Sequence, residues 1–504
     1  MSILEIDNTS RRAFARPWRH AIVAAGLTML TGCLVGPKYR PPPIQAPGAY
    51  KELAPADGVS TVAWKPARPS DTIIRDKWWR IFGDPQLDAL EDQVDISNQN
   101  IAAAVANYAA ARALVRQARS QFSPTVTVGA SFNSERLSVI PGTGATSGKT
   151  YREYSFPIEA SWEPDLWGRV RNTARAAAYA AQASSADLQS VRLAAHAQLA
   201  ANYFALRGQD SLKQVLDSTL TSSRDTLDIT RGLYRAGLTT NEAVSAAEAQ
   251  FNATQALEKN TGILRAQYEH AIAIVLGKTP AEIAIPPTSQ DPIVPFTPPG
   301  VPARLLERRP DIAAAERGVA AANAQIDVAR AAFFPDITLS ASGGFTSFTA
   351  ADWFTWPSRV WAVGPTLAET IFDAGLRRAT VQQYRSRYEQ AVATYRQTSL
   401  IAFQQVEDNL AADRILRSEL LDQDAAIAAA QRGFDESQVR YRAGLDPYIN
   451  VIQAQMSLLS YQQTAVNLHC QQMIAAVQLI EALGGGWDAT QLPDVKSVNQ
   501  LKSR

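Results

Sequence analysis

Two stretches of this chain have a helical pattern over a length that no compact domain requires. They follow Gly168 and Gly375, run to Tyr234 and Tyr441, and contain no proline. Because an α-helix rises about 1.5 Å per residue, each stretch predicts a helix on the order of 100 Å long. Within the second stretch, apolar residues recur at the spacings of 3 and 4 that indicate coiled-coil packing; they are Val381, Tyr384, Tyr388, Ala391 and Tyr395. We therefore expect a tall, helix-rich structure.

The body of the chain is a doubled sequence, which indicates an internal repeat. Three landmarks recur in the same order, 211 or 207 residues later: the segments that begin at Ala118, Tyr234 and Leu276 recur at Ala329, Tyr441 and Leu483. We expect residues 71–290 and 291–487 to form the same unit, and residues 488–504 to form a C-terminal tail. The unit consists of a helix, two strands, a very long helix, a tight turn and a long helix.

Local signals mark the starts of the first helix in each repeat. Asp84 and Pro85 form an N-cap followed by proline at the first helical position, and Pro310 and Asp311 place proline and an acid in a first turn. Proline lacks the N–H that has no partner there, and the carboxylate suits the helix dipole. These signals predict helices over residues 85–120 and 310–333.

Each very long helix is expected to end in a tight turn. Gly237 and Gly444 stand where a left-handed residue is needed, and Leu238 and Leu445 follow them, placed to cover the last turn. Each helix pair is therefore predicted to be a hairpin with one of these glycines at its tip.

Four segments alternate apolar residues with small or polar ones, as strands with one apolar face do. Their apolar positions are Val126, Val128, Ala130 and Phe132; Tyr154, Phe156, Ile158, Ala160 and Trp162; Ile337, Leu339, Ala341, Gly343 and Phe345; and Trp361, Val363, Pro365 and Leu367. A sheet packed on a soluble core is one explanation. The aromatic residues near strand ends instead favour strands whose apolar face meets lipid. The secretory signal at the N-terminus, described below, favours the same interpretation.

Strands in a membrane must leave no backbone group unpaired, so they close into barrels, and single-chain barrels have at least about eight strands. Four strands per chain are too few. Several copies must therefore pool their strands, and the long helices, which continue from the strands, must pool into a helical tube in the periplasm. The expected fold is a mixed α/β membrane protein, mainly of long helices, with four transmembrane strands per chain.

The first 32 residues have the pattern of a secretory signal. Four arginines precede an apolar run, Ala21 to Leu30, that is too short to span a bilayer. The run ends in Leu-Thr-Gly-Cys, which resembles the bacterial lipobox, so we expect cleavage before Cys33 and acylation of this cysteine; an ordinary signal with a coincidental cysteine is the alternative. Leu34 follows instead of aspartate, which is typical of routing to the outer membrane. Residues 33–70, rich in Pro and Ala, suit an extended tether.

Charge and composition argue against several classes of function. The 49 Lys and Arg nearly balance the 48 Asp and Glu, so the chain lacks the strong positive net charge that attracts nucleic acid. The two cysteines and four histidines are widely spread, and we expect neither a metal site nor a disulfide framework. His196, His270 and His469 stand singly on helical patterns, so no enzyme and no cofactor are expected. We interpret Cys470 as a small buried hydrophobe; a reactive thiol is the alternative.

Several motifs together resemble one known family. They are Gly36-Pro37-Lys38-Tyr39, Trp78-Trp79 with Asp84-Pro85-Gln86-Leu87, the run Trp162 to Gly168, the run Leu305 to Ile312, and the doubled Tyr-Arg-Ala-Gly turns. With them the chain resembles the outer-membrane efflux channels of the TolC and OprM type, in their lipoprotein branch, over residues 33–487.

The resemblance implies a homotrimer with a 12-stranded β-barrel and a periplasmic α-barrel, in the outer membrane of a Gram-negative bacterium. It also implies docking with a periplasmic adaptor and an inner-membrane pump to expel small toxic compounds. Export of proteins or polysaccharides through the same tube is the alternative. A periplasmic adaptor or coiled-coil scaffold would explain the helices but not the strands.

The family closes its periplasmic mouth with hydrogen bonds and ion pairs between hairpin tips. The resemblance places these residues at the gate: Tyr234, Arg235, Glu242, Tyr441, Arg442, Asp446, Asn450 and Gln453. Where the family often has acids beyond each turn, this chain has Ala243, Asn450 and Gln453, so no acidic ring is predicted. We expect Tyr441, Arg442 and Asp446 to hold the closed state, so that mutating Tyr441 and Asp446 together raises single-channel conductance. Solvated helix ends without a gating role are the alternative.

Overall fold

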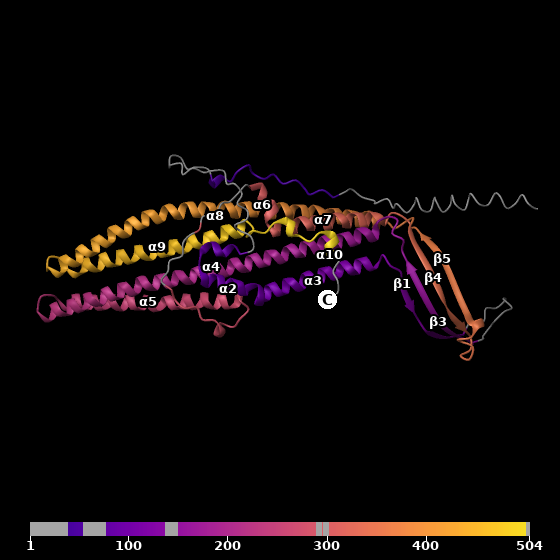
Figure 1. The fold of residues 1–504 in the computed structure, drawn as a ribbon, viewed down its shortest axis with the longest axis horizontal. Helices are drawn as coiled ribbons and strands as arrows, with labels where there is room; N and C mark the ends of the chain where they lie inside the picture. Colours follow the sequence, from indigo (N-terminus) through magenta and orange to yellow (C-terminus); the bar gives the residue numbers. More distant parts are fainter. Residues whose placement is uncertain (1–38, 54–76, 137–149, 289–294, 296–301, 500–504) are drawn as a thin grey trace, which may run out of the picture.

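The computed structural model describes residues 39–53, 77–136, 150–288, 295 and 302–499. These residues form an elongated molecule in which long helices continue, at one end, into a small antiparallel sheet (Figure 1). Cys33, and with it the predicted signal and lipidation site, lies outside the described residues.

Both repeats contain the predicted order of elements. The first comprises η2 (Trp78–Phe82), α2 (Pro85–Ser97), α3 (Gln99–Ser120), β1 (Thr125–Val128), β2 (Ser131–Arg136), β3 (Thr150–Trp162), α4 (Arg169–Arg235), α5 (Asn241–Val275) and η3 (Pro280–Glu282). The second comprises α6 (Pro302–Arg308), α7 (Pro310–Ala331), β4 (Asp336–Ser347), η4 (Trp356–Ser358), β5 (Arg359–Ala368), α8 (Leu376–Arg442) and α9 (Tyr448–Ala482). Helices α4 and α8 have 67 residues each, and α5 and α9 have 35 each, so the predicted very long helices are confirmed.

The helix predicted over residues 85–120 is wrong in one respect, because it is broken at Asn98. The Asn98 side chain accepts a hydrogen bond from the Ile101 N–H at 3.0 Å and donates one to the Val275 carbonyl at 2.7 Å. Asparagine is a strong N-cap. It therefore ends α2 and starts α3, while Asp84 caps α2 as predicted.

The repeated Leu-Gly pair has the same structural role in both repeats. Gly277 follows α5 and Gly484 follows α9, with φ of +65° and +92°. A Cβ atom on Gly277 would lie 2.0 Å from the carbonyl oxygen of Ser97, and one on Gly484 would lie 2.1 Å from that of Arg308. Ser97 and Arg308 are the last residues of α2 and α6. Each hairpin therefore ends against the matching break in the first helix of its own repeat.

The strands of the described ranges form one antiparallel sheet in the order β1/β2, β3, β4, β5. Strands β1 and β2 both pair with β3, and the register is the same for both. The interruption between them lies opposite Pro157, which has no N–H to donate to the ladder. The N–H of Gly129 still donates to the Pro157 carbonyl at 2.9 Å. The predicted strand through this segment is thus confirmed, with one local gap in its hydrogen bonds.

The helices and the strands share one lateral order. Helix α3 leads into β1, β3 into α4, α7 into β4, and β5 into α8. Near the sheet, the helices lie side by side as α3, α4, α7 and α8, and nearer the tips α5 lies beside α4 and α9 lies beside α4 and α8 (Figure 1). The chain is therefore a single plate from the sheet to the hairpin tips.

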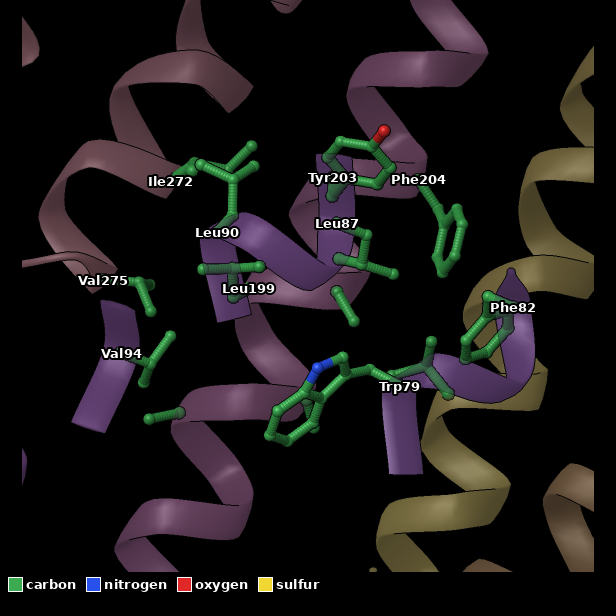
Figure 2. Packing of buried hydrophobic residues seen from close by; sticks show 14 of the residues in the cluster. Trp79, Phe82, Leu87, Leu90, Val94, Leu199, Tyr203, Phe204, Ile272 and Val275 are labelled. Atoms are coloured by element: carbon green, nitrogen blue, oxygen red, sulfur yellow. The ribbon is translucent and has the colours of Figure 1, made fainter. Parts of the chain in front are cut away.

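Apolar clusters hold this plate together. The largest lies where η2 and α2 pack against α4 and α5, and it includes Trp79, Leu87 and Tyr203 (Figure 2). A second cluster joins α7, α8 and α9 and contains Tyr395 and Tyr388 of the predicted coiled-coil pattern. That pattern is therefore confirmed as packing surface at these positions.

Both ends of the described chain are tied back onto the plate. In the segment 39–53, which ends in η1 (Lys51–Leu53), the Tyr39 hydroxyl donates to Glu316 Oε1 at 2.5 Å and the Lys51 N–H donates to Glu407 Oε1 at 2.8 Å. At the other end, η5 (Ala489–Gln491) precedes α10 (Val495–Asn499), which packs on α3 and α4 through the buried Val498.

Candidate functional site

The sheet has one apolar face and one polar face. The register places the four predicted apolar series on the same face: Val126 lies opposite Ala160, Ala160 opposite Ala341, and Ala341 opposite Val363. Residues that face each other on neighbouring strands point to the same side of a sheet. The apolar face is therefore continuous across the whole sheet.

This apolar face is open to its surroundings in the single chain. Its exposed side chains include Val126 at 66%, Val128 at 65%, Trp361 at 81%, Val363 at 73% and Leu367 at 66%. A soluble monomer rarely leaves a continuous apolar face of this kind uncovered. The alternative of a sheet packed on a soluble core therefore fails for the described residues.

Both edges of the plate are free within the part of the chain that the structure describes. Strands β1/β2 at one edge and β5 at the other each have one neighbour. Exposed apolar side chains also occur on the outer helices α3, α5 and α8; they are Leu114, Ile263, Leu264, Leu400, Ile415 and Leu421. A strand edge with unpaired backbone groups cannot face hydrocarbon. In the single chain, both edge strands of this sheet therefore keep unpaired backbone groups.

The motif from Trp162 to Gly168 sets the junction between sheet and helix. Asp165 accepts hydrogen bonds, at 2.9 Å each, from two backbone N–H groups in the first turn of α4. Trp167 donates its indole N–H to the Pro335 carbonyl at 2.8 Å. The Asp165 bonds cap the start of α4, and the Trp167 bond joins the segment before α4 to the residue before β4.

Both hairpin tips have the turn geometry that the sequence predicts. Gly237 and Gly444 have φ of +69° and +72°. The N–H groups of Leu238 and Leu445 donate to carbonyl oxygens five residues earlier, at 2.9 Å each. This is the Schellman arrangement, in which the residue before the donor adopts a left-handed conformation.

The prediction that Leu238 and Leu445 cover the last turns is wrong. Their side chains are 74% and 70% exposed. In the second hairpin, the space between the helices is filled by Tyr441 and Tyr448, whose rings lie 5.2 Å apart. Leu445 lies outside this ring contact and is exposed to solvent.

Tyr441, a predicted gate residue, lies inside its own chain. Its side chain is 5% exposed, and its hydroxyl oxygen lies 3.1 Å from Thr230 Oγ1. Tyr441 therefore joins α8 to α4 as well as to α9.

The ion pair at the second tip involves Arg440, which the sequence pattern did not indicate. Nε and Nη2 of Arg440 lie 2.6 and 3.2 Å from the two carboxylate oxygens of Asp446. The hydrogen bond from Arg440 lowers the pKa of Asp446 below 3.8, so this carboxylate is ionised at neutral pH. Arg440 thus contacts both carboxylate oxygens of Asp446 within the same hairpin. Arg442 itself is exposed.

The other predicted gate residues lie around the two tips, at the end of the molecule opposite the sheet (Figure 1). Tyr234 is 46% exposed, and Arg235, Glu242 and Gln453 are exposed. Asn450 is half-buried. The exposed members are free to contact another molecule.

A buried charged cluster lies between α2 and α4. His196 Nδ1 lies 2.6 Å from Glu91 Oε2, His196 Nε2 lies 3.5 Å from Asp95 Oδ2, and the imidazole stacks on Trp79 at 4.5 Å. His196 stands singly in its local sequence pattern, but the fold gives it two carboxylate partners. Its nearer partner is 105 residues away in sequence, which no local spacing reveals.

The cluster has a structural explanation. Burial lowers the pKa of His196, but hydrogen bonds to Asp95 and Glu91 outweigh it and raise the pKa from 6.5 to about 9. Burial raises the pKa of Glu91. At neutral pH an imidazolium therefore bridges α2 and α4. Among the described residues, no group of three or more His, Cys, Asp or Glu side chains is arranged to hold a metal ion.

Cys470 is half-buried where α9 crosses α4, with its Sγ 3.8 Å from the Phe204 carbonyl oxygen. Burial raises the pKa of its thiol. This environment agrees with the predicted packing role and not with a reactive thiol.

None of the helices in the described ranges has an apolar segment long enough to cross a lipid bilayer.

Known proteins match this chain along most of its length. Residues 90–278 and 301–485 match the family described as outer membrane efflux protein. The chain is 32% identical to the solvent efflux pump outer membrane protein SrpC of Pseudomonas putida, an alignment that covers 92% of this chain and 98% of that one. It is 31% identical to the antibiotic efflux pump outer membrane protein ArpC of the same species, over 91% and 94% of the two chains. The structure of the outer-membrane channel OprN has a TM-score of 0.83 at 29% identity, over 90% of this chain and 100% of that one.

These matches and the open apolar sheet define the class: the protein is the outer-membrane channel component of an efflux system, located in the outer membrane of a Gram-negative bacterium. The chain belongs to the outer membrane efflux protein family. The two matched segments begin in or just before α2 and α6 and end just after Gly277 and Gly484. The family match therefore has the same two-part form as the repeat.

Proposed function

We propose that three copies of this chain close into one channel, with a 12-stranded barrel in the outer membrane and a helical tube in the periplasm. The observation that carries this proposal is the plate with two free edges and one exposed apolar face. The edge formed by β5 and α8 of one copy meets the edge formed by β1/β2, α3 and α5 of the next. A head-to-tail contact of this kind makes a ring when its rotation closes.

Acylation of Cys33 anchors the chain to the same membrane. In this arrangement the segment 39–53, bound along α7 and α8, carries the chain from the lipid anchor to the periplasmic helices. The very long helices then reach toward the inner membrane.

The channel acts with a periplasmic adaptor and an inner-membrane pump, and its cargo is small toxic compounds such as solvents and antibiotics. The functions for which SrpC and ArpC are named support this cargo class. The channel itself is a passive conduit, and the pump supplies the energy and the selection. Catalysis by this chain has no part in the proposal.

Deleting the gene in the parent bacterium is expected to lower the minimal inhibitory concentrations of toluene-like solvents and hydrophobic antibiotics at least fourfold. Wild-type protein supplied from a plasmid restores resistance. Unchanged susceptibility together with loss of a secreted protein or polysaccharide would favour the secretion alternative and contradict the proposed cargo.

We further propose that the tips form the periplasmic gate, with Gly237 and Gly444 setting the turns. The gate residues are Tyr234, Arg235, Glu242, Tyr441, Arg442, Asp446, Asn450 and Gln453. Two of them act within the chain, since Tyr441 fixes α8 against Thr230 and Asp446 holds Arg440. The exposed members, which are free to contact the neighbouring copy, are Tyr234, Arg235, Glu242, Arg442 and Gln453.

Removing the Tyr441–Thr230 contact and the Arg440–Asp446 ion pair at the second tip is expected to open the channel. Tyr441→Phe with Asp446→Asn removes the hydroxyl contact and the ion pair while it keeps side-chain size, and we expect at least a twofold higher single-channel conductance in planar bilayers. The matched control is Asp422→Asn, an exposed carboxylate on α8 away from the tip. A double variant that conducts like the control would refute the gate.

A further inference from the structure

The end of the sheet far from the helices carries basic side chains on its apolar face. Arg136 is at the end of β2, Arg152 is near the start of β3, and Arg359 begins β5. In the register, Ser134 lies opposite Arg152, and Arg359 lies opposite Phe345. Since side chains alternate along a strand, all three arginines belong to the face that holds Phe132, Tyr154 and Phe345.

The acids of the same region belong to the other face. Glu153 lies opposite Asn133, and Glu135 lies opposite Tyr151, all on the polar side of the β2–β3 hairpin. Positive charge therefore points outward with the apolar residues, and negative charge points inward. A hairpin that merely extended into water would have no reason to sort its charges by face.

Aromatic rings form a band directly beside these arginines. Trp353 and Phe354, from the connection between β4 and β5, fold onto the apolar face, with ring centroids 5.4 Å from Tyr154 and 5.6 Å from Phe345, respectively. Phe132 lies 4.8 Å from Tyr154. Aromatic side chains gather where a membrane protein meets the lipid head groups. The arginines therefore stand at head-group level.

Arg136 and Arg152 have no partner within the described residues. No hydrogen bond or ion pair to another described side chain engages either guanidinium, and both residues are exposed. They occupy diagonal positions on neighbouring strands, where side chains start about 7–8 Å apart. Two guanidinium groups at that spacing can both reach the oxygens of one phosphate group.

Arg359 is placed differently. Its guanidinium lies over the Trp356 ring, 3.0 Å from the centroid, and its Nε donates to the Trp356 carbonyl at 2.9 Å. Arg359 adds positive charge to the apolar face, but its guanidinium already contacts the ring and the carbonyl of Trp356. Asp352, the acid of this connection, accepts a hydrogen bond from the Thr349 hydroxyl at 2.5 Å.

We propose that Arg136 and Arg152 bind the phosphate groups of anionic glycolipids in the outer leaflet of the outer membrane. This inference rests on the proposed barrel, because the apolar face must meet lipid for the arginines to reach head groups. The face offers acyl chains an apolar surface and aromatic rings, and it offers the phosphates two unpaired guanidinium groups. Each copy in the channel thereby binds these glycolipids around the outside of the barrel.

The test is native mass spectrometry of the purified full-length protein in detergent, titrated with bisphosphorylated lipid A. Arg136→Gln with Arg152→Gln is expected to weaken lipid A binding about tenfold. Arg116→Gln with Arg432→Gln, two exposed arginines on α3 and α8, is the charge-matched control and is expected to bind like wild type. Equal binding by the hairpin variant and the control would overturn the proposal.

A second measurement needs no variant. Wild-type protein is expected to bind lipid A from which the phosphates have been removed at least fivefold more weakly than the bisphosphorylated form, and equal binding of the two lipids also overturns the proposal. Conductance recorded on the same preparations separates the two claims. Channels that conduct normally but show no phosphate dependence contradict the lipid site alone, whereas protein that never conducts contradicts the proposed channel.

Discussion

Replacing Gly277 with alanine is expected to lower the free energy of unfolding by about 3 kcal/mol. The left-handed conformation costs an alanine roughly 1–2 kcal/mol. The new methyl group would also lie 2.0 Å from the backbone oxygen of Ser97, which cannot rotate away. Forcing the break between α2 and α3 to move adds a cost of about 1–3 kcal/mol, as overpacking does. Thermal melting followed by circular dichroism measures the loss, and Gly484→Ala should behave alike.

Two other glycines separate these causes. Gly83 has φ of +64°, and a methyl group added to it would have nothing within 4 Å, so Gly83→Ala carries the conformational cost alone. Gly232 lies inside α4 with equally open space, so Gly232→Ala carries neither cost. If Gly277→Ala melts at the same temperature as Gly83→Ala, the close approach to Ser97 has no energetic weight.

Much of the fold could be predicted because its signals are local. The lengths of α4 and α8 follow from proline-free helical runs between glycines with positive φ, at Gly168 and Gly237 in one case and Gly375 and Gly444 in the other. The shared face of the strands follows from their period of two. The doubling of these patterns indicated the order of elements in both repeats.

The structure differs from the sequence predictions where the interacting residues are far apart along the chain. The break at Asn98 depends on the Val275 carbonyl, 177 residues away, and the charged cluster joins His196 to Glu91 across 105 residues. Hydrophobic periodicity carries no information about such pairs.

The ion pair at the second hairpin tip could have been predicted from the sequence. Asp446 and its partner Arg440 flank the glycine turn, six residues apart. Once a Schellman turn is placed at Gly444, these two side chains lie on the same side of it, so the turn geometry was the signal that could have found them.

Placing a lysine on the apolar face of β5 is expected to prevent assembly in the membrane. Val363 is 73% exposed and lies opposite Ala341. A lysine at the middle of a lipid-facing strand costs about 2–4 kcal/mol, and every copy in the ring bears that cost. Val363→Lys should therefore be lost from the outer-membrane fraction.

The matched control is Ala362→Lys, one residue earlier. Ala362 lies opposite Ser342, on the polar face. It should tolerate the charge and assemble normally, since the polar face lines the interior of the proposed barrel. Equal assembly of the two variants would show that the apolar face does not meet lipid.

Each chain is expected to supply one third of a closed channel wall. Native mass spectrometry of the acylated protein in detergent, with planar-bilayer recording of the same sample, tests it most directly. We expect a mass of three chains and discrete conductance steps. A mass of one chain, with no conductance, would contradict this expectation.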